Sequence, residues 1–313
     1  MLSAYVIMNC VILPPFLQAE EQKSAIKQRF FATPEEASNA LLEASRAKDH
    51  AAMHEIFGPE GQTLITGDKV RDAAAFDAFC RAVGQLCLPS KEGNDRVVLN
   101  IGAHNWPFPI PIVQKDGKWF FDTEAGKEEI INRHIGEDEL NAIEVCRTYV
   151  EAQRQYASQD RDGSEVLKYA QKLKSTPGKK DGLYWELAKD EETSPFGPLV
   201  AEARAEGYGL DKNAEGPRPF HGYIFKILTK QGAAAPGGEY NYIINGNMIA
   251  GFALVAYPVT WEQSGIMTFI VNQQGKVYER NLGPKTAELA SAMTEYNPDS
   301  NWKPVKKEEP LKK

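Results

Sequence analysis

Apolar residues recur at helical spacing in the first third of the chain. Thr33-Pro34-Glu35-Glu36 predicts a helix start, because Thr33 can cap the helix, Pro34 suits its first turn and Glu36 can reach back to the cap amide. Asp49 predicts the cap of a second, short helix that ends at Gly58. The apolar positions that predict a third helix are Phe76, Phe79, Cys80, Val83 and Cys87.

The pattern then changes to the alternation that is typical of strands. Val97, Leu99 and Ile101 alternate with less apolar neighbours and predict a strand. Three prolines between residues 106 and 113 restrict that stretch to an edge or an extended segment. Asp116-Gly117 predicts a two-residue hairpin. Helices followed by strands predict an α+β domain over residues 33–135, preceded by a polar tether, 20–32.

A second domain, residues 136–302, is expected to consist of a long helix packed on an antiparallel sheet. We expect Gly136 to end a short helix and Glu137-Asp138-Glu139 to open the long one, with the acids at its positive end. Its apolar stripe contains Ile143, Cys146, Tyr149, Val150, Gln153, Tyr156 and Ala157. The segment 160–216 is predicted to be irregular and packed on the sheet, with a short helix near 199–205.

The sheet is predicted within Pro219–Gly283, where apolar runs at 223–228, 240–244, 250–258, 266–271 and 277–278 are separated by turns such as Asn245-Gly246 and Gln274-Gly275. A closing helix is expected near 287–293. The charged residues 303–313 are expected to be a disordered tail.

The chain's N-terminal end resembles an export signal. Residues 1–19 are almost uncharged and apolar, and Glu20-Glu21 follows at once. The apolar run is shorter than the roughly 20 residues that a membrane span needs, and Pro14-Pro15 interrupts it. A signal peptide with Ala19 before its boundary fits this pattern, so we expect a periplasmic or extracellular protein with no membrane span after cleavage.

Charge and cysteine content narrow the possible functions. With 36 basic and 43 acidic residues, the net charge is −7 and no basic stripe is present, which argues against nucleic acid as a partner. Beyond the signal peptide the chain has Cys80, Cys87 and Cys146. On one helix, Cys80 and Cys87 would be about 10 Å apart, too far for a disulfide. We expect no structural disulfide.

Several sequence blocks resemble one bacterial family. They are Trp106-Pro-Phe-Pro-Ile-Pro, Ser175-Thr-Pro-Gly-Lys, Asp181-Gly-Leu-Tyr-Trp, His221-Gly-Tyr, Ala235-Pro-Gly-Gly, Gly251-Phe-Ala-Leu-Val-Ala and Met267-Thr-Phe-Ile-Val-Asn. Together they look like the exported domain-of-unknown-function family 2950, over nearly everything from Phe31 to Trp302. The resemblance implies a bacterial envelope or secreted protein, and it implies no activity.

Two looser resemblances concern the fold. The helices followed by a curved sheet in the first domain are similar to nuclear-transport-factor and cystatin-like folds. The long helix, irregular loop and strand meander of the second domain are similar to the heads of type IV pilins and pseudopilins. A pilin has its apolar N-terminal helix running directly into the head, whereas a whole domain intervenes here, so a pilin-like head would serve binding.

Two sites are candidates for chemistry. Asp160, Asp162 and Glu165 place carboxylates close together in a loop after the long helix, which could bind calcium, but the glycine position departs from a calcium-hand loop and a plain turn explains the same residues. His221 could be a base or ligand contact, or it could hydrogen-bond a loop. No other cofactor is indicated.

Two functional hypotheses follow. The first is a non-catalytic envelope or secreted interaction module, acting in assembly, secretion or surface display through a protein partner. The second is a small-ligand-binding protein or hydrolase, with a pocket in the first domain lined by Trp106, Phe108 and Trp119. The chain lacks a GxSxG motif and a dinucleotide fingerprint, which favours the first.

Overall fold

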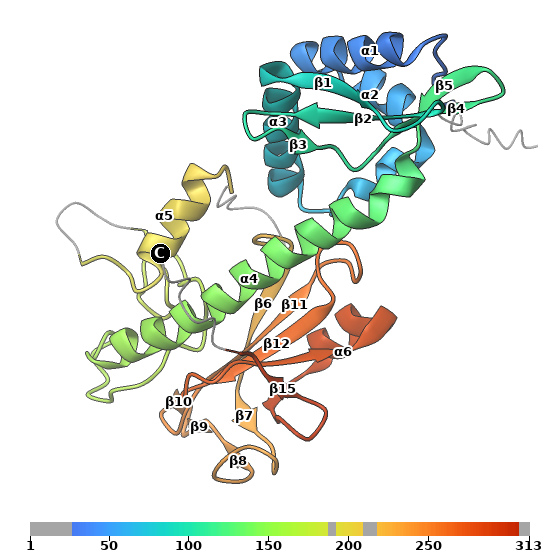
Figure 1. Ribbon diagram of the computed structural model, residues 1–313. Coiled ribbons are helices and arrows are strands. Elements are labelled where there is room, and N and C mark those ends of the chain that lie inside the picture. The colour runs from blue at the N-terminus through green and yellow to red at the C-terminus, as the bar shows by residue number, and fades with distance from the viewer. Residues whose placement is uncertain (1–26, 187–191, 209–217, 307–313) are drawn as a thin grey trace, which may run out of the picture.

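The computed structural model describes residues 27–186, 192–208 and 218–306 (Figure 1). The expected signal peptide, most of the tether and residues 307–313 lie outside the described residues. Within them the chain is a mixed α+β protein, as the sequence predicts, and its strands form several sheets. Its buried apolar residues form two separate groups, which we call the first core and the second core.

The first core lies between three helices and one antiparallel sheet. The helices are α1 (Pro34–Ala47), α2 (His50–Phe57) and α3 (Lys69–Gln85), with a 3-10 helix at Pro59–Leu64. The strands are β1 (Cys87–Lys91), β2 (Arg96–Ile101), β3 (Trp106–Pro107), β4 (Ile112–Lys115) and β5 (Lys118–Phe121), in the order β1-β2-β4-β5 with β3 also paired to β2. Val97, Leu99 and Ile101 face this core and are buried.

Local sequence signals explain how these elements begin and turn. Thr33 Oγ1 accepts the Glu36 N–H at 3.1 Å, and the Glu36 carboxylate accepts the Ala32 N–H, one residue before the expected amide. Asp116 and Gly117 both have positive φ, 50° and 76°, as the tight turn between β4 and β5 requires. The predicted first helix and hairpin are therefore confirmed.

The third helix differs from the prediction at its end. Helix α3 ends at Gln85, and Cys87 begins β1, where it pairs with Ile101 of β2. Cys80 and Cys87 therefore do not share a helix. Cys80, Cys87 and Cys146 are all free thiols. The end of the helix shifts because the chain after Leu86 gains a full strand pairing, which helical spacing alone does not reveal.

One long helix connects the two cores. Helix α4 (Thr123–Ala157) has 35 residues, and its N-cap Asp122 accepts the Ala125 N–H at 3.3 Å. The prediction that one helix ends at Gly136 and another opens at Glu137 is wrong, because α4 continues through both. In Figure 1 the helix passes from the first sheet to the second. The expected domain boundary after residue 135 thus falls inside a continuous helix.

The second core lies around a five-stranded antiparallel sheet. Its strands are β6 (Tyr223–Leu228), β11 (Ala253–Pro258), β12 (Met267–Asn272), β13 (Tyr278–Asn281) and β15 (Lys303–Pro304), in the order β15-β13-β12-β11-β6. Helix α4 packs on β11 and β12, and α6 (Thr286–Ala292), preceded by a 3-10 helix at Gly283–Lys285, packs on β11. Every residue of β11 is buried, so both faces of this strand are covered.

The remaining strands form smaller units. Strands β7 (Lys230–Gln231), β8 (Tyr240–Asn241) and β14 (Glu295–Tyr296) make a three-stranded sheet, and β9 (Ile243–Ile244) pairs only with β10 (Asn247–Met248). The segment 240–244 therefore does not join the main sheet as predicted. Buried Tyr242 explains this difference. Its N–H donates a hydrogen bond to Thr229 O and its hydroxyl donates one to Gln231, and these two bonds hold the segment away from the main sheet.

Two further predictions concern the loop and the tail. The segment after α4 is irregular, with α5 (Gly197–Ala205) as its short helix, and Tyr184, Trp185 and Phe196 in it are buried in the second core. Residues 303–313 were expected to be disordered, but Lys303 and Pro304 form β15 against β13, and Val305 N–H bonds Val277 O at 3.0 Å.

Candidate functional site: a buried ionic junction

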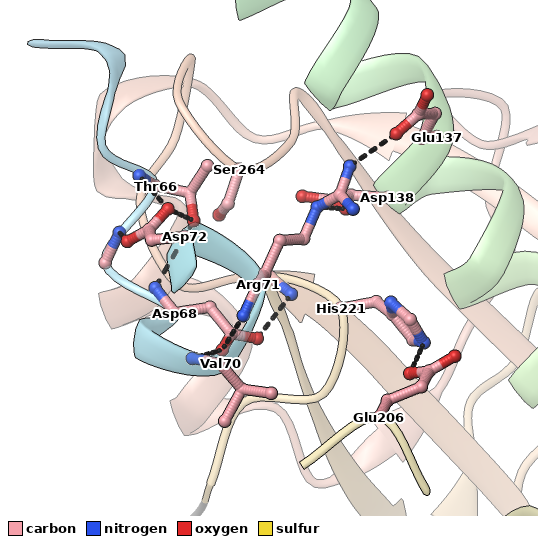
Figure 2. Close-up of polar contacts among 12 residues, drawn as sticks. Thr66, Asp68, Val70, Arg71, Asp72, Glu137, Asp138, Glu206, His221 and Ser264 are labelled. Carbon is pink, nitrogen blue, oxygen red and sulfur yellow. Dashed lines mark hydrogen bonds and ion pairs between the residues drawn. The ribbon is translucent and has the colours of Figure 1, made fainter. Parts of the chain in front are cut away.

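Ionisable side chains from four separate segments meet where the first and second cores adjoin (Figure 2). The segments are the start of α3, the middle of α4, the residues after α5 and the turn before β6. We call the group formed by Asp68, Arg71, Asp138, Glu206, Tyr208, His221 and Gly222 the junction. It is the place where charge is most deeply enclosed among the described residues, so it is the candidate functional site.

Asp68 holds the junction together through both carboxylate oxygens. Its Oδ1 caps α3 by accepting the Val70 and Arg71 N–H groups at 3.0 and 3.2 Å. Its Oδ2 accepts the Tyr208 hydroxyl at 2.8 Å and the Gly222 N–H at 3.1 Å. Asp68 is buried. One side chain therefore both starts a helix of the first core and binds two segments of the second.

A second aspartate fixes the loop before Asp68. Asp72 accepts the N–H and the hydroxyl of Thr66 at 2.9 and 2.7 Å, and the N–H of Gly67 at 3.2 Å. Asp72 lies one helical turn after Asp68, so the first turn of α3 folds back on its own entry loop. This arrangement sets the direction in which Asp68 points.

Arg71 pairs with two consecutive acids of α4. Its Nη2 donates to Glu137 Oε2 at 2.7 Å, and its Nε lies against Asp138 Oδ1 in an ion pair. The Asp138 side chain has no exposed surface, whereas that of Glu137 is largely exposed. Burial opposes the charge of Arg71, but the hydrogen bond to Glu137 and the charges of both acids raise its pKa.

The position of Asp138 on α4 explains its burial. It lies three residues after buried Ile135 and four before buried Ala142, on the same stripe that faces the cores. The tri-acid sequence therefore does not sit at a helix terminus as expected. The three acids contact two segments: Glu137 and Asp138 both meet Arg71 of α3, and Glu139 Oε1 accepts the N–H groups of Ile266 and Met267, both at 2.9 Å.

Burial controls the protonation of Asp138. Desolvation raises the pKa of its carboxyl from 3.8 to about 8, and the nearby carboxylates act in the same direction, against the attraction of Arg71. Apart from the ion pair with Arg71, no group of the described residues donates a hydrogen bond to either carboxyl oxygen. Burial therefore favours the neutral form of the Asp138 carboxyl, and the contact with Arg71 opposes this.

The other side of the junction contains a tyrosine and a histidine. Tyr208 accepts the His221 N–H at 3.1 Å, and burial raises the pKa of the Tyr208 hydroxyl. His221 Nε2 lies 2.9 Å from Glu206 Oε2, and burial lowers the pKa of the imidazole despite this neighbour. His221 has a φ of 45°, so the turn before β6 holds it in a left-handed conformation.

This arrangement can hold and exchange protons, and its groups are paired with one another. His221, which the sequence suggests as a base, a ligand contact or a loop-bonding residue, is part of the junction. Its backbone N–H donates to Tyr208 and its ring contacts Glu206, both in the segment after α5.

A separate, open hollow of about 460 Å³ lies along α4. It is lined by Ala125, Glu128, Glu129, Asn132 and Arg133, none of them in the junction.

The sequence-predicted calcium residues lie in a turn after α4. Asp160 Oδ1 accepts the N–H groups of Asp162, Gly163 and Ser164, and its Oδ2 accepts that of Glu165 at 2.7 Å. Asp162 forms an ion pair with Lys168 at 2.5 Å. Within residues 27–186, 192–208 and 218–306, no group of three or more His, Cys, Asp or Glu side chains is placed to hold a metal ion.

The predicted pocket residues pack on one another. Trp106, Phe108 and Trp119 belong to the first core or its edge, and Phe108 and Trp119 are buried. The ring of Phe108 lies 5.2 Å from that of Phe79 and 6.0 Å from that of Trp106, measured between centroids. These aromatic side chains thus contact other side chains of the first core.

The sequence did not single out Asp68, Arg71, Glu206 or Tyr208. Asp68 and Tyr208 are 140 positions apart, so local patterns could not bring them together. The one available signal was Asp138, whose spacing from Ile135 and Ala142 places an acid on an apolar stripe.

Comparison with known proteins gives a family without an assigned activity. The fold is that of an α+β protein in which one long helix connects two cores. A buried ionic junction lies where these two cores adjoin. The family model described as protein of unknown function (DUF2950) matches residues 28–305, so the chain belongs to that family. No match was found among curated proteins or among solved structures. None of the described helices is long and apolar enough to cross a membrane.

Proposed function

We propose that this chain is an exported, non-catalytic interaction module that binds an envelope or secreted protein partner. The observation that carries the proposal is a set of exposed aliphatic side chains on two segments bonded to each other in the C-terminal part. Leu167, Ile244 and Ile249 expose 60%, 46% and 42% of their surface. Exposed apolar groups that gather in one region are typical of protein-binding surfaces.

The backbone around these side chains is well fixed. The Tyr169 N–H donates to Met248 O at 2.8 Å, and the Gln171 side chain donates to Gly246 O at 2.8 Å. Lys168 Nζ donates to Asn247 Oδ1 at 3.1 Å. The loop after α4 is thereby tied to the β9–β10 hairpin, so a partner would meet a preformed surface and lose little free energy in ordering it.

Two sequence features support the same proposal. Residues 1–19 have the pattern of a signal peptide, which supports export to the periplasm or the outside of the cell. The order of a long helix, an irregular loop and a strand meander along the sequence resembles pilin heads, which use that loop for contacts. We therefore propose the surface around Leu167 and Ile244 as the binding face.

The test is site-specific photo-crosslinking in cells that express the full chain with its own leader. A photoreactive residue is placed at Leu167, at Ile244 or, as a control, at Leu140, which is also exposed but lies on α4. We expect the same crosslinked protein at the first two positions and not at the third, in the exported fraction. The substitution Leu167→Asp should reduce its yield in the Ile244 experiment.

Three results would contradict the proposal. They are retention of the chain in the cytoplasm, equal crosslinking at all three positions, and no crosslinked protein at either Leu167 or Ile244. Turnover of a small molecule that is unaffected by Leu167→Asp would favour the ligand-binding or hydrolase alternative.

A further inference from the structure

The junction contains more acid than base in an enclosed space. The charged or titratable groups around Asp138 are Asp68, Arg71 and Asp72 from α3 and its entry, His134, Glu137 and Glu139 from α4, Glu206 and Tyr208 after α5, and His221 and Tyr223 at β6. Arg71 is the only fixed positive charge among them. The guanidinium of Arg71 contacts Glu137 and Asp138, and Asp68 adds a second buried carboxylate whose charge opposes that of Asp138, so ionising both is unfavourable away from water.

The close contacts of Asp138 leave little room for water. Its Oδ2 lies so near Gly222 that a β-carbon on that residue would be only 2.6 Å away, and Ser264 adjoins the same spot. Figure 2 shows the carboxyl of Asp138 between Arg71 and the segment of Ser264. A negative charge on Asp138 could gain water only if these segments separate.

We propose that Asp138 is a proton-sensitive latch: when its carboxyl is protonated, the Thr66–Asp72 segment stays docked on the Tyr208 and Gly222 segments, and loss of that proton loosens the docking. The latch concerns contacts within the chain and goes beyond the proposed binding function, since it would operate whether or not the Leu167 surface binds a partner.

The direction of the effect follows from proton linkage. In an opened junction Asp138 is solvated, and the pKa of its carboxyl returns towards the ordinary value. At any pH above that ordinary pKa, the opened form therefore binds fewer protons than the closed form. Because the pKa in the closed form is about 8, the closed form loses stability as pH rises towards 8, and above 8 the effect levels off. Asparagine at this position stays neutral and should remove the dependence.

The test is hydrogen–deuterium exchange of the backbone in segments 203–208 and 220–223 of the full chain, corrected for the intrinsic effect of pH. In the wild type, protection should fall between pH 6 and 8, by up to about tenfold for each pH unit, which is the limit for one linked proton, and less steeply near pH 8. In Asp138→Asn the corrected protection should not change over this range. The control Glu144→Gln, at an exposed acid of the same helix, should behave as the wild type.

A second measurement does not depend on any variant. The Asp138 carboxyl can be titrated in the wild type by carbon-13 NMR, and its midpoint should coincide with the pH at which the fall in protection levels off. Three results would each overturn the proposal. They are protection of the wild type that stays constant from pH 6 to 8, an Asp138 titration midpoint below pH 6, and a pH dependence of protection in Asp138→Asn that is as steep as in the wild type.

Discussion

Gly222 and Asp138 approach each other so closely that only glycine fits between β6 and α4. A β-carbon on residue 222 would lie 2.6 Å from Asp138 Oδ2 and 2.9 Å from the β-carbon of Ser264. The φ of Gly222 is 70°, a conformation that other residues adopt with strain. Its N–H is also bonded to Asp68. The junction therefore depends on a glycine in the turn as much as on its charged side chains.

Substituting Gly222 with alanine should destabilise the protein by about 3 kcal/mol, because the clash with two segments adds to the backbone strain. Gly246→Ala is the matched control: its φ is 81°, but no atom lies within 4 Å of the added β-carbon, so the cost should be about 1 kcal/mol. Urea denaturation of both variants measures the difference. Equal losses would show that the space around Gly222 can relax.

Asp68→Ala should cost more than loss of an ordinary helix cap. Asp49 is the matched control, because its side chain caps α2 by accepting the N–H groups of Ala51 and Ala52 and bonds no other group in the described part of the chain. We expect about 1 kcal/mol for Asp49→Ala and about 3 kcal/mol for Asp68→Ala, since Tyr208 and Gly222 also lose their partner. Similar losses in urea denaturation would mean that the bonds across the junction contribute little.

Much of the fold could be predicted because its signals are local. The cap at Thr33 and the Asp116-Gly117 turn each depend on residues within a few positions. The continuity of α4 could not be predicted this way. Glycine inside a helix costs only about 1 kcal/mol, so Gly136 is tolerated when both halves of the helix pack on a core.

The junction could not be predicted for a different reason. Tyr208 joins Asp68 through a contact between distant parts of the chain, and nothing near either residue in the sequence specifies the other. His221 was noticed only as a histidine at the start of a strand, and the structure adds its partner Glu206. Glu137-Asp138-Glu139 suggested a helix start because acids are favourable there. The same three residues can also lie inside a helix, and the local sequence does not distinguish the two positions.

Asp181 should make stability depend on acid pH. Burial opposes its ionisation, but hydrogen bonds from Lys172 and Thr176 outweigh this and lower the pKa of the carboxyl to about 2. Because the folded pKa is depressed, its contribution is present above the ordinary value of 3.8 and is lost as pH falls towards 2.

The substitution Asp181→Asn should therefore cost about 1 kcal/mol at pH 6, allowing for partial exposure, and much less at pH 2.5. Urea denaturation at both pH values measures this, and Lys172→Met should reproduce part of the effect. A cost that is the same at pH 6 and pH 2.5 would assign Asp181 a role independent of its charge.

The turn after α4 should be held by Asp160 itself. Four backbone N–H groups already point at its carboxylate, so a calcium ion would have to compete with them for the same oxygens. We expect Asp160→Ala to destabilise the protein by about 1 kcal/mol, and millimolar calcium to leave the melting temperature of the wild type unchanged. A ligand that binds only the folded state must raise that temperature. A calcium-dependent rise in the wild type that disappears in Asp160→Ala would therefore establish the metal site that the sequence predicts.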